Sequence, residues 1–335
     1  MRRMADTERI ELVNRAVDAI LVGPRAPRPE LDADTAELGR LAEELWLMPA
    51  EDFRQRLKSQ LNEAAKEEKT MSTAATAKAA LPPGFQTVNV YLVVNGAARL
   101  IDFLKQAFSA EETFRMPRPD GAIMHAEVKI GETMLETADA NDQHPPTPSA
   151  FHIYVENADE TYRRALEAGA VSLTSLREDY GERFGSVRDP VGNEWYIATH
   201  TSGKPGQFIP EGLRNVNPYL HPKGAAEFME FAARAFGAEE VVRYADENGV
   251  VRHAKIRIGD SIIELGEAHD QWQPMPTTLH HYVTDCDAAW RRAVEAGAKP
   301  LNPPADQPYG ERNGAVTDAW GNRWFVATFL KDVRV

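Results

Sequence analysis

The chain has 335 residues, which is more than one hydrophobic core usually organises, so we expect two or three domains. Hydrophobic residues make up 43% of the sequence and charged residues 27%, a composition that excludes a disordered or fibrous chain. The net charge of −13, from 38 basic and 51 acidic residues with no basic run, argues against nucleic acid as a partner.

The sequence predicts a cytoplasmic protein with no membrane partner. The N-terminus runs into a charged helical pattern without an apolar signal segment, and no stretch approaches 18 apolar residues. The lone cysteine, Cys286, excludes an intrachain disulfide and a cysteine-based zinc site, which fits a reducing compartment.

Residues 1–68 are predicted to form an N-terminal helical segment. Three amphipathic stripes follow one another there, beginning at Ile10, Leu38 and Phe53. Three short helices are marginal alone, so docking on the rest of the chain, homo-oligomerisation and contact with another protein are all open. Residues 69–83, rich in Ala, Thr, Ser and Pro, are predicted to be a linker.

The rest of the chain is predicted to be an internal duplication. An offset of 128 residues, which becomes 129 past Glu178, brings matching residues together. The matched pairs include Asn89 and Asn217, Gly96 and Gly224, His125 and His253, Glu136 and Glu264, His152 and His280, and Trp195 and Trp324. This constancy indicates two tandem domains, at 84–201 and 213–335, joined by a linker at 202–212.

Each repeat is predicted to contain two βαβββ modules. In the first module, residues 88–94 alternate like a strand, Gly96 opens an amphipathic helix, and residues 125–130 and 133–138 form later strands. The order then recurs, with a strand at 150–155 and a helix at 159–168. The expected fold class is α+β, built from tandem βαβββ modules after an N-terminal helical segment.

Four short motifs recur in this pattern. They are Asn-Val-Tyr-Leu or Asn-Pro-Tyr-Leu on the first strand, His-Ala before an Ile-Gly turn, Tyr-Gly-Glu-Arg, and Asp-Pro-Val-Gly-Asn-Glu-Trp. Over residues 84–333 the chain resembles the vicinal oxygen chelate superfamily of glyoxalase I, bleomycin resistance proteins and extradiol dioxygenases, and within it the PhnB-like branch. The resemblance implies U-shaped sheets around a ligand cleft and an intramolecular pseudo-dimer.

The resemblance also implies where a divalent metal would bind. Metal-dependent relatives place ligands on the first, fourth, fifth and eighth strands, and only the fourth-strand carboxylate is matched, by Glu136 and Glu264. The other positions hold Asn89 and Asn217, Ala150 and Thr278, and Tyr196 and Phe325. We therefore favour no metal or other cofactor. A shifted site for Zn, Ni, Mn or Fe stays open, because His152 and His280 lie two residues further along the fifth strand.

The candidates for chemistry are Glu136, His152, Glu264 and His280. Each glutamate lies in an apolar strand, where an unpaired carboxylate is costly and needs a partner or a task. Each histidine is either a general base, a ligand contact or a structural hydrogen-bond partner. Whether a glutamate meets the histidine of its own repeat depends on whether modules are exchanged, which the sequence leaves open.

The candidates for ligand binding belong to the strands and loops around the expected cleft. They are Asn89, Tyr91, His125, Tyr180, Arg183, Tyr196, Asn217, Tyr219, His253, Tyr309, Arg312 and Phe325. The arginines suit an anionic ligand or an internal brace to a glutamate, and the histidines at 125 and 253 also fit a solvated strand face. Trp195 and Trp324 alternate to the opposite side and are assigned to the core.

Three functions are compatible with this pattern. The first is capture of a small polar or aromatic molecule without a metal, as in the resistance proteins of the superfamily. The second is a divalent-metal lyase or dioxygenase with a rearranged site centred on Glu136 with His152 or on Glu264 with His280. The third is a scaffold whose N-terminal helices bind a partner, which predicts that removing residues before Lys69 abolishes partner binding.

Overall fold

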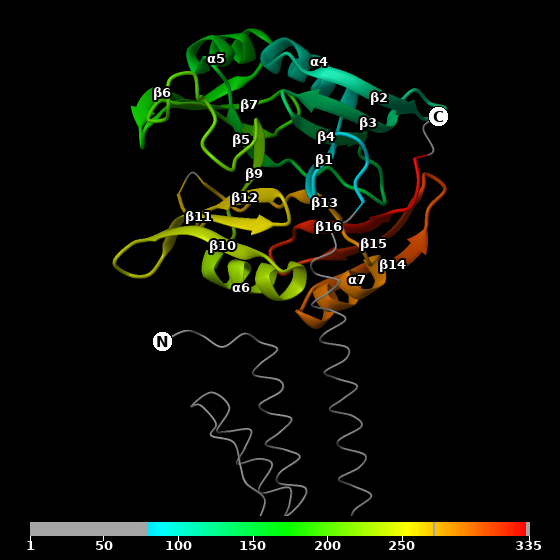
Figure 1. Cartoon of the computed structure of the whole chain (residues 1–335). Coiled ribbons are helices and arrows are strands. Elements are labelled where there is room, and N and C mark those ends of the chain that lie inside the picture. Colours follow the sequence, from blue (N-terminus) through cyan, green and yellow to red (C-terminus); the bar gives the residue numbers. More distant parts are fainter. Residues whose placement is uncertain (1–79, 271, 333–335) are drawn as a thin grey trace, which may run out of the picture. The chain divides into compact units, whose positions relative to one another are not determined.

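The computed structural model describes residues 80–270 and 272–332, and the predicted N-terminal helices at 1–68 lie outside them. Four βαβββ modules make up the described part, two in each repeat, which confirms the predicted fold class (Figure 1). The first repeat contains β1 (Val88–Val94), α4 (Ala97–Phe108), β2 (Glu111–Pro117), β3 (Ile123–Ile130), β4 (Thr133–Asp139), β5 (Ala150–Tyr154), α5 (Ala158–Glu167), β6 (Val171–Asp179), β7 (Glu182–Arg188) and β8 (Glu194–His200). The second contains β9 (Val216–Leu220), α6 (Ala225–Phe236), β10 (Glu239–Ala245), β11 (Val251–Ile258), β12 (Ser261–Leu265), β13 (Thr278–Tyr282), α7 (Cys286–Glu295), β14 (Lys299–Asp306), β15 (Glu311–Thr317) and β16 (Arg323–Phe329).

The helices begin where the sequence supplies an N-cap. Gly96 and Gly224 precede α4 and α6 in the left-handed conformation, at φ of 95° and 82°, which glycine adopts without steric cost. Asn157 and Asp285 cap α5 and α7, since each side chain accepts a hydrogen bond from a backbone N–H three residues on. None of the helices in the described part of the chain is long and apolar enough to cross a membrane.

Each sheet takes one module from each repeat. The first sheet has the order β14-β15-β16-β13-β1-β4-β3-β2, and the second has β10-β11-β12-β9-β5-β8-β7-β6. Antiparallel pairs join the repeats at the two centres, where Asn89 lies opposite His280 and His152 lies opposite Asn217. The modules are therefore exchanged, which answers the question that the sequence leaves open.

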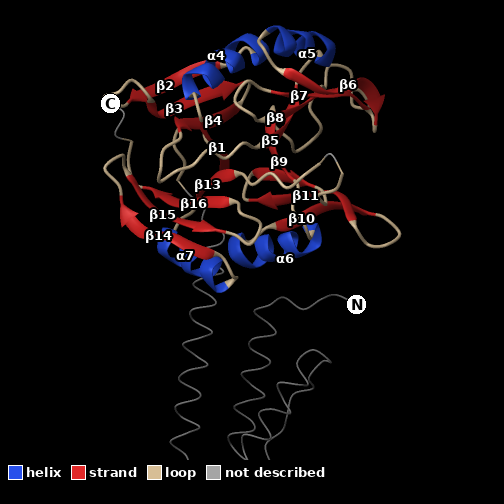
Figure 2. Ribbon diagram, turned by 180° about the vertical axis from the view of Figure 1, so that it is seen from behind, coloured by secondary structure: helices blue, strands red, loops and turns tan. Residues whose placement is uncertain are grey.

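The helices, in contrast, associate within a repeat. α4 packs on α5 and α6 packs on α7, on the outer sides of the sheets (Figure 2). Beneath them Trp195 and Trp324 are fully buried, with ring centroids 4.8 Å from Phe108 and 4.1 Å from Phe236 respectively. The prediction that both tryptophans belong to the core is confirmed. Strand exchange and helix pairing together tie the repeats to each other.

Candidate functional site

The side of each sheet opposite its helices carries the candidate residues. We call this side of the first sheet, formed by β1–β4 and β13–β16, the first inner face; that of the second sheet is the second inner face (Figure 1). Alternate residues of a strand point to the same side. Because Trp324 packs under the helices, its neighbours Arg323 and Phe325 belong to the first inner face.

A buried Glu–His–Glu group lies on the first inner face. Nδ1 of His280 is 2.9 Å from Oε2 of Glu136, which belongs to the other repeat. Nε2 of His280 is 3.3 Å from Oε2 of Glu311, and the hydroxyl of Tyr282 donates to Oε1 of Glu311 over 2.7 Å. All four residues are more than nine-tenths buried, so the group is held away from bulk water.

The same arrangement recurs on the second inner face. Nδ1 of His152 is 3.0 Å from Oε2 of Glu264, and Nε2 is 3.5 Å from Oε2 of Glu182. The hydroxyl of Tyr154 donates to Glu182 over 2.8 Å. This group is more open, because its histidine and second glutamate are 12% and 18% exposed, against 7% and 8% in the first group. Each candidate glutamate thus meets the candidate histidine of the other repeat.

Both histidines are held in the charged form. Burial acts to lower the pKa of His280, but the charges of Glu136 and Glu311 outweigh it and raise the pKa to about 10. The two carboxylates beside His152 overcome burial in the same way and raise its pKa to about 9. Burial acts to raise the pKa of Glu264, yet the adjacent imidazolium lowers it. At neutral pH each imidazole is therefore a cation with two N–H donors.

One contact in the first group leaves hydrogen-bonding capacity unused. His280 Nε2 and Glu311 Oε2 are within ion-pair distance but are not aligned for a hydrogen bond, and neither atom has another hydrogen-bond partner among the described residues. A buried polar atom without a partner costs about 1–3 kcal/mol. The first group therefore holds a buried donor and a buried acceptor whose hydrogen bonding its own partners do not complete.

These groups do not fit a divalent metal centre. A metal takes the lone pair of a neutral imidazole nitrogen, whereas both nitrogens of His280 face carboxylates and carry protons at neutral pH. Within residues 80–270 and 272–332, no three or more His, Cys, Asp or Glu side chains are arranged to hold an ion. The rearranged pairs Glu136 with His152 and Glu264 with His280 are not brought together, because module exchange pairs Glu136 with His280 and Glu264 with His152 as ion pairs.

The glutamate of each Tyr-Gly-Glu-Arg motif belongs to the site, although the arginine beside it is the residue that the sequence analysis selects. Arg183 forms an ion pair with Asp159 of α5 at 2.6 Å, and Arg312 bonds Asp287 of α7 at 2.8 Å. Adjacent residues of a strand point to opposite sides, so Glu182 faces inward while its neighbour reaches the helix. The arginines therefore brace helices, and the structure does not bring them to the inner faces.

The two candidate asparagines bond to backbone. The side chain of Asn89 accepts from the N–H of Gln86 and donates to its carbonyl, at 3.0 and 2.7 Å. Asn217 makes the same pair of bonds with Arg214. Both ends of each amide are engaged in the turn before the strand, so these residues shape the start of β1 and β9.

The two motif tyrosines lie in different surroundings. Tyr180 is 94% exposed, whereas Tyr309 is half-exposed. Burial and the charge of Glu311 together raise the pKa of Tyr309, which places its hydroxyl within electrostatic reach of the first group. Tyr309 is therefore the better shielded of the two motif tyrosines.

Aromatic rings adjoin each Glu–His–Glu group. They are Tyr91 and Phe325 on the first inner face, with centroids 5.7 Å apart, and Tyr219 and Tyr196 on the second, with centroids 5.3 Å apart. The hydroxyl of Tyr91 is 3.2 Å from Nδ1 of His125, and that of Tyr219 is 3.2 Å from Nδ1 of His253. Six predicted ligand contacts are thus brought together beside the two groups.

Beyond these rings the first inner face has a basic end, which we define as Arg118, His144 and Arg323. Nη1 of Arg323 donates to Nδ1 of His144 over 3.2 Å, and the ring of His144 lies 6.3 Å from that of Phe325. Nη2 of Arg118 donates to the carbonyl of Asp139 over 2.8 Å. These three residues are not predictable from the sequence pattern, because Arg118 and His144 lie in loops.

The second inner face has an aromatic end instead, which we define as Tyr196, His221 and Trp272. The hydroxyl of Tyr196 is 2.9 Å from Nε2 of His221, and the ring of His221 stacks on Trp272 with centroids 5.6 Å apart. Burial lowers the pKa of His221 to about 4, so this ring is neutral at pH 7.

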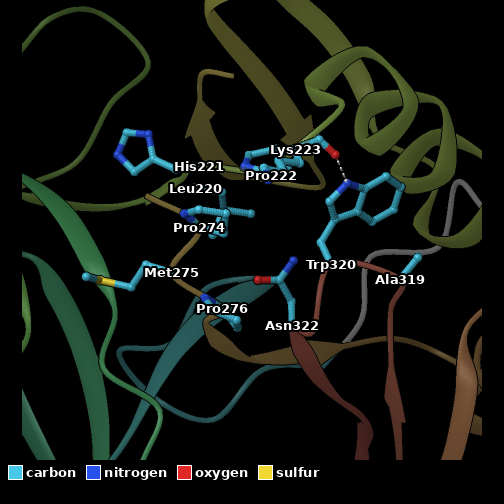
Figure 3. Close-up of a pocket in the computed structure, with 10 residues that line it drawn as sticks. All are labelled: Leu220, His221, Pro222, Lys223, Pro274, Met275, Pro276, Ala319, Trp320 and Asn322. Atoms are coloured by element: carbon cyan, nitrogen blue, oxygen red, sulfur yellow. Dashed lines mark hydrogen bonds between the residues drawn. The ribbon is translucent and has the colours of Figure 1, made fainter. Parts of the chain in front are cut away.

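A surface pocket of about 390 Å³ adjoins the aromatic end through His221 (Figure 3). Its walls are Leu220, His221, Pro222, Lys223, Pro274, Met275, Pro276, Ala319, Trp320 and Asn322. The indole of Trp320 donates to the carbonyl of Lys223 over 2.7 Å, which ties the turn before β16 to the start of α6. The pocket is mostly apolar and does not include either Glu–His–Glu group.

Comparison with known proteins agrees with this architecture. Residues 85–197 and 222–326 match the family described as Glyoxalase/Bleomycin resistance protein/Dioxygenase superfamily. Glyoxalase I from Zea mays shares the fold, with a TM-score of 0.56 and 14% identity over 72% of this chain and 92% of that one. A point mutant of the same maize enzyme gives a TM-score of 0.56 at 13% identity, over 72% and 94% of the two chains.

The curated relatives are shorter and uncharacterized. A protein of Mycobacterium bovis is 38% identical over 123 residues, which cover 32% of this chain and 78% of that protein. A protein of Mycobacterium tuberculosis is 37% identical over 123 residues, covering 32% and 70% respectively. The matched length is about that of one repeat.

Proposed function

The chain belongs to the glyoxalase/bleomycin resistance protein/dioxygenase superfamily, and from this premise we propose that each inner face captures one small aromatic molecule without a metal. The ligand combines a ring with a hydroxyl or similar polar group. We also propose that the protein is cytoplasmic and belongs to the PhnB-like branch, because the chain carries the strand and turn motifs of that branch.

The observation that carries the proposal is the unused hydrogen-bonding capacity between His280 and Glu311. The imidazolium Nε2–H is a donor, and Oε2 of Glu311 is an acceptor, 3.3 Å apart in a buried place. A ligand hydroxyl both accepts and donates, so one group satisfies both atoms. On the second inner face the matching contact between His152 and Glu182 is 3.5 Å long.

The neighbouring rings supply the rest of the binding surface. Tyr91 and Phe325, or Tyr219 and Tyr196, offer aromatic faces beside the polar group. Ring pairs of this kind contribute about 0.5–1.5 kcal/mol beyond the apolar area that they bury. The site therefore suits a molecule with one polar end and one flat apolar end.

The charge state of the histidines favours capture over acid–base catalysis. A general base works best when its pKa is near the working pH. His280 and His152, with pKa values of about 10 and about 9, are protonated at pH 7 and are not proton acceptors there. Donation to a bound ligand is the role that remains for them.

Calorimetric titration with phenol tests the proposal. Phenol carries a ring and a hydroxyl, so we expect two sites per chain, with at least tenfold weaker binding of toluene, which has no hydroxyl. Tyr91→Ala and Tyr219→Ala should each remove one site. Tyr180→Ala, at the 94% exposed tyrosine, is the matched control and should leave both sites intact.

Measuring the metal content of the purified protein tests the alternative of a metal-dependent enzyme. Protein purified without a His tag or a chelator should contain no stoichiometric divalent ion. If it holds an ion that Glu136→Ala and Glu264→Ala both lose, or if phenol binding is absent, capture without a metal is wrong.

A further inference from the structure

The basic end of the first inner face holds two guanidinium groups that are not in ion pairs with carboxylates of the described residues. Arg323 donates to His144, and Arg118 donates to a backbone carbonyl. Both arginines are half-buried, and burial lowers the pKa of Arg323. The carboxylate of Asp139 is already engaged, because it accepts from the N–H groups of Gly96, Ala97 and Ile123.

His144 lies beside Arg323 and is affected by the charges of both arginines. Its pKa is lowered first by burial and then by the charges of Arg323 and Arg118. Because Nδ1 of His144 accepts from Arg323, the neutral ring carries its proton on Nε2. Two guanidinium groups and a neutral imidazole thus lie at this end of the face. Burial acts to raise the pKa of Asp139, but three backbone N–H groups and then the charge of Arg118 lower it, and those N–H groups occupy the carboxylate.

The second inner face has no such end. At the positions equivalent to Arg118, His144 and Arg323 the chain has Asp246, Trp272 and Glu194. Both acidic residues are paired, Asp246 with Arg252 at 2.7 Å and Glu194 with Arg188 at 2.8 Å. Because the second inner face satisfies these positions with acidic and aromatic residues, the fold itself does not require two arginines on the first inner face.

The rest of the first inner face fixes where an anionic group can lie. Glu136 and Glu311 repel it from the centre. The ring of Phe325 lies between the centre and the basic end, 6.3 Å from the rings of both His280 and His144. An aromatic ring stacked on Phe325 would direct a carboxylate substituent to the arginines. Guanidinium groups bind planar carboxylates through two parallel hydrogen bonds.

We infer that the first inner face binds the carboxylate of a small aromatic acid through Arg118, His144 and Arg323, and that the second inner face does not bind such acids. The inference rests on the proposed function and adds the charge of the ligand. By this inference the two duplicated sites differ in the charge of the ligand: the first inner face binds aromatic acids, and the second binds neutral aromatic molecules.

Benzoate and benzamide test it, since they have nearly the same shape and differ in charge. In the full chain, calorimetry should find one benzoate site and at least tenfold weaker binding of benzamide there. Arg323→Gln should weaken benzoate about tenfold and leave benzamide within twofold. Arg323→Lys keeps the positive charge but loses the two parallel N–H donors of the guanidinium group, so its affinity for benzoate should lie between those of the wild type and Arg323→Gln. Arg99→Gln, on the exposed side of α4, is the matched control and should change nothing.

Arg118→Gln gives a second measurement in case Arg323→Gln does not fold, and it should also weaken benzoate selectively. Equal affinities for benzoate and benzamide, two benzoate sites per chain, or tighter binding of phenyl phosphate than of benzoate would overturn the inference. If phenol binds while benzoate shows no advantage over benzamide, only the inference is wrong. If phenol, benzamide and benzoate all fail to bind, the proposed function is wrong as well.

Discussion

The two inner faces share a Glu–His–Glu group but differ in the residue on the strand beside it. Glu127 lies opposite Glu136 on the first face, whereas Lys255 lies opposite Glu264 on the second, with its Nζ 3.6 Å from that carboxylate. On the first face Glu136 and Glu311 share the imidazolium of His280, and Glu127 lies 3.6 Å from Nε2 of His125. On the second face Glu264 contacts both His152 and Lys255. The two repeats thus keep the same Glu–His–Glu group with different neighbours. The stability of each group should therefore depend on its histidine to a different extent.

The largest expected difference is the loss of stability on removing each histidine. His280→Gln leaves Glu136 and Glu311 buried without their cation, and we expect a loss of about 3–5 kcal/mol in the free energy of unfolding. His152→Gln should lose about 1–3 kcal/mol, because Lys255 still faces Glu264. Urea unfolding at pH 7 measures both.

Lys255→Glu sharpens this comparison, because it gives the second face the charges of the first. In that background His152→Gln should become as costly as His280→Gln. If the two histidine substitutions cost the same in the wild-type background, the neighbouring lysine does not compensate the group.

The pH dependence of stability should follow the raised pKa values of the same histidines. His280 and His152 stabilise the fold fully below pH 6.5, the pKa of an unfolded histidine, and this contribution disappears as the pH rises through about 9 and 10. The free energy of unfolding should fall between pH 6.5 and 9 by at most about 1.4 kcal/mol per pH unit for each histidine. The slope should be smaller in His280→Gln, and an unchanged slope would count against a charged His280.

A smaller effect is expected at the aromatic end. Tyr196→Phe copies the residue that the first face has at position 325, and it removes the hydrogen bond to Nε2 of His221. Because His221 is 8% exposed and its Nδ1 already has no hydrogen-bond partner within the described part of the chain, we expect a loss of about 1–2 kcal/mol. Thermal unfolding measures it, and Tyr180→Phe, at an exposed hydroxyl, should change stability by less than about 0.5 kcal/mol.

The smallest effect is expected at the motif arginines. Arg183 and Arg312 pair with exposed carboxylates beside the helices, so Arg183→Gln should cost about 0–1 kcal/mol in stability. Phenol affinity should stay within twofold of the wild type. A larger loss of affinity would show that an arginine reaches the ligand after all.

Much of the fold can be predicted from the sequence, because each strand pattern of the first repeat recurs about 128 residues later in the second. The sequence does not show which two modules share a sheet. The apolar sides of β1 and β5 are buried whichever module completes the sheet. Only the register, with Asn89 opposite His280, records the exchange. Pairing of this kind joins residues nearly 200 positions apart, which local patterns do not contain.

The site is predicted in part for a similar reason. Glu136 and His280 are identifiable because a carboxylate and an imidazole interrupt apolar strands. Glu182 escapes notice beside Arg183, although the fully buried Val187 shows that the odd-numbered residues of β7 face the helices. The basic end is harder to predict, because Arg118 and His144 lie in loops whose path depends on the finished sheet.

Exchange of modules has a consequence for how the chain evolves after duplication. Two identical single-repeat chains assembled by this pairing would be related by a twofold axis and would carry two identical inner faces. In the fused chain the first face is built from the first and last modules, and the second face from the two between them. No strand serves both faces. A substitution at Glu127 or Arg323 therefore alters one face alone, and fusion has turned a symmetric pair of sites into two that diverge independently.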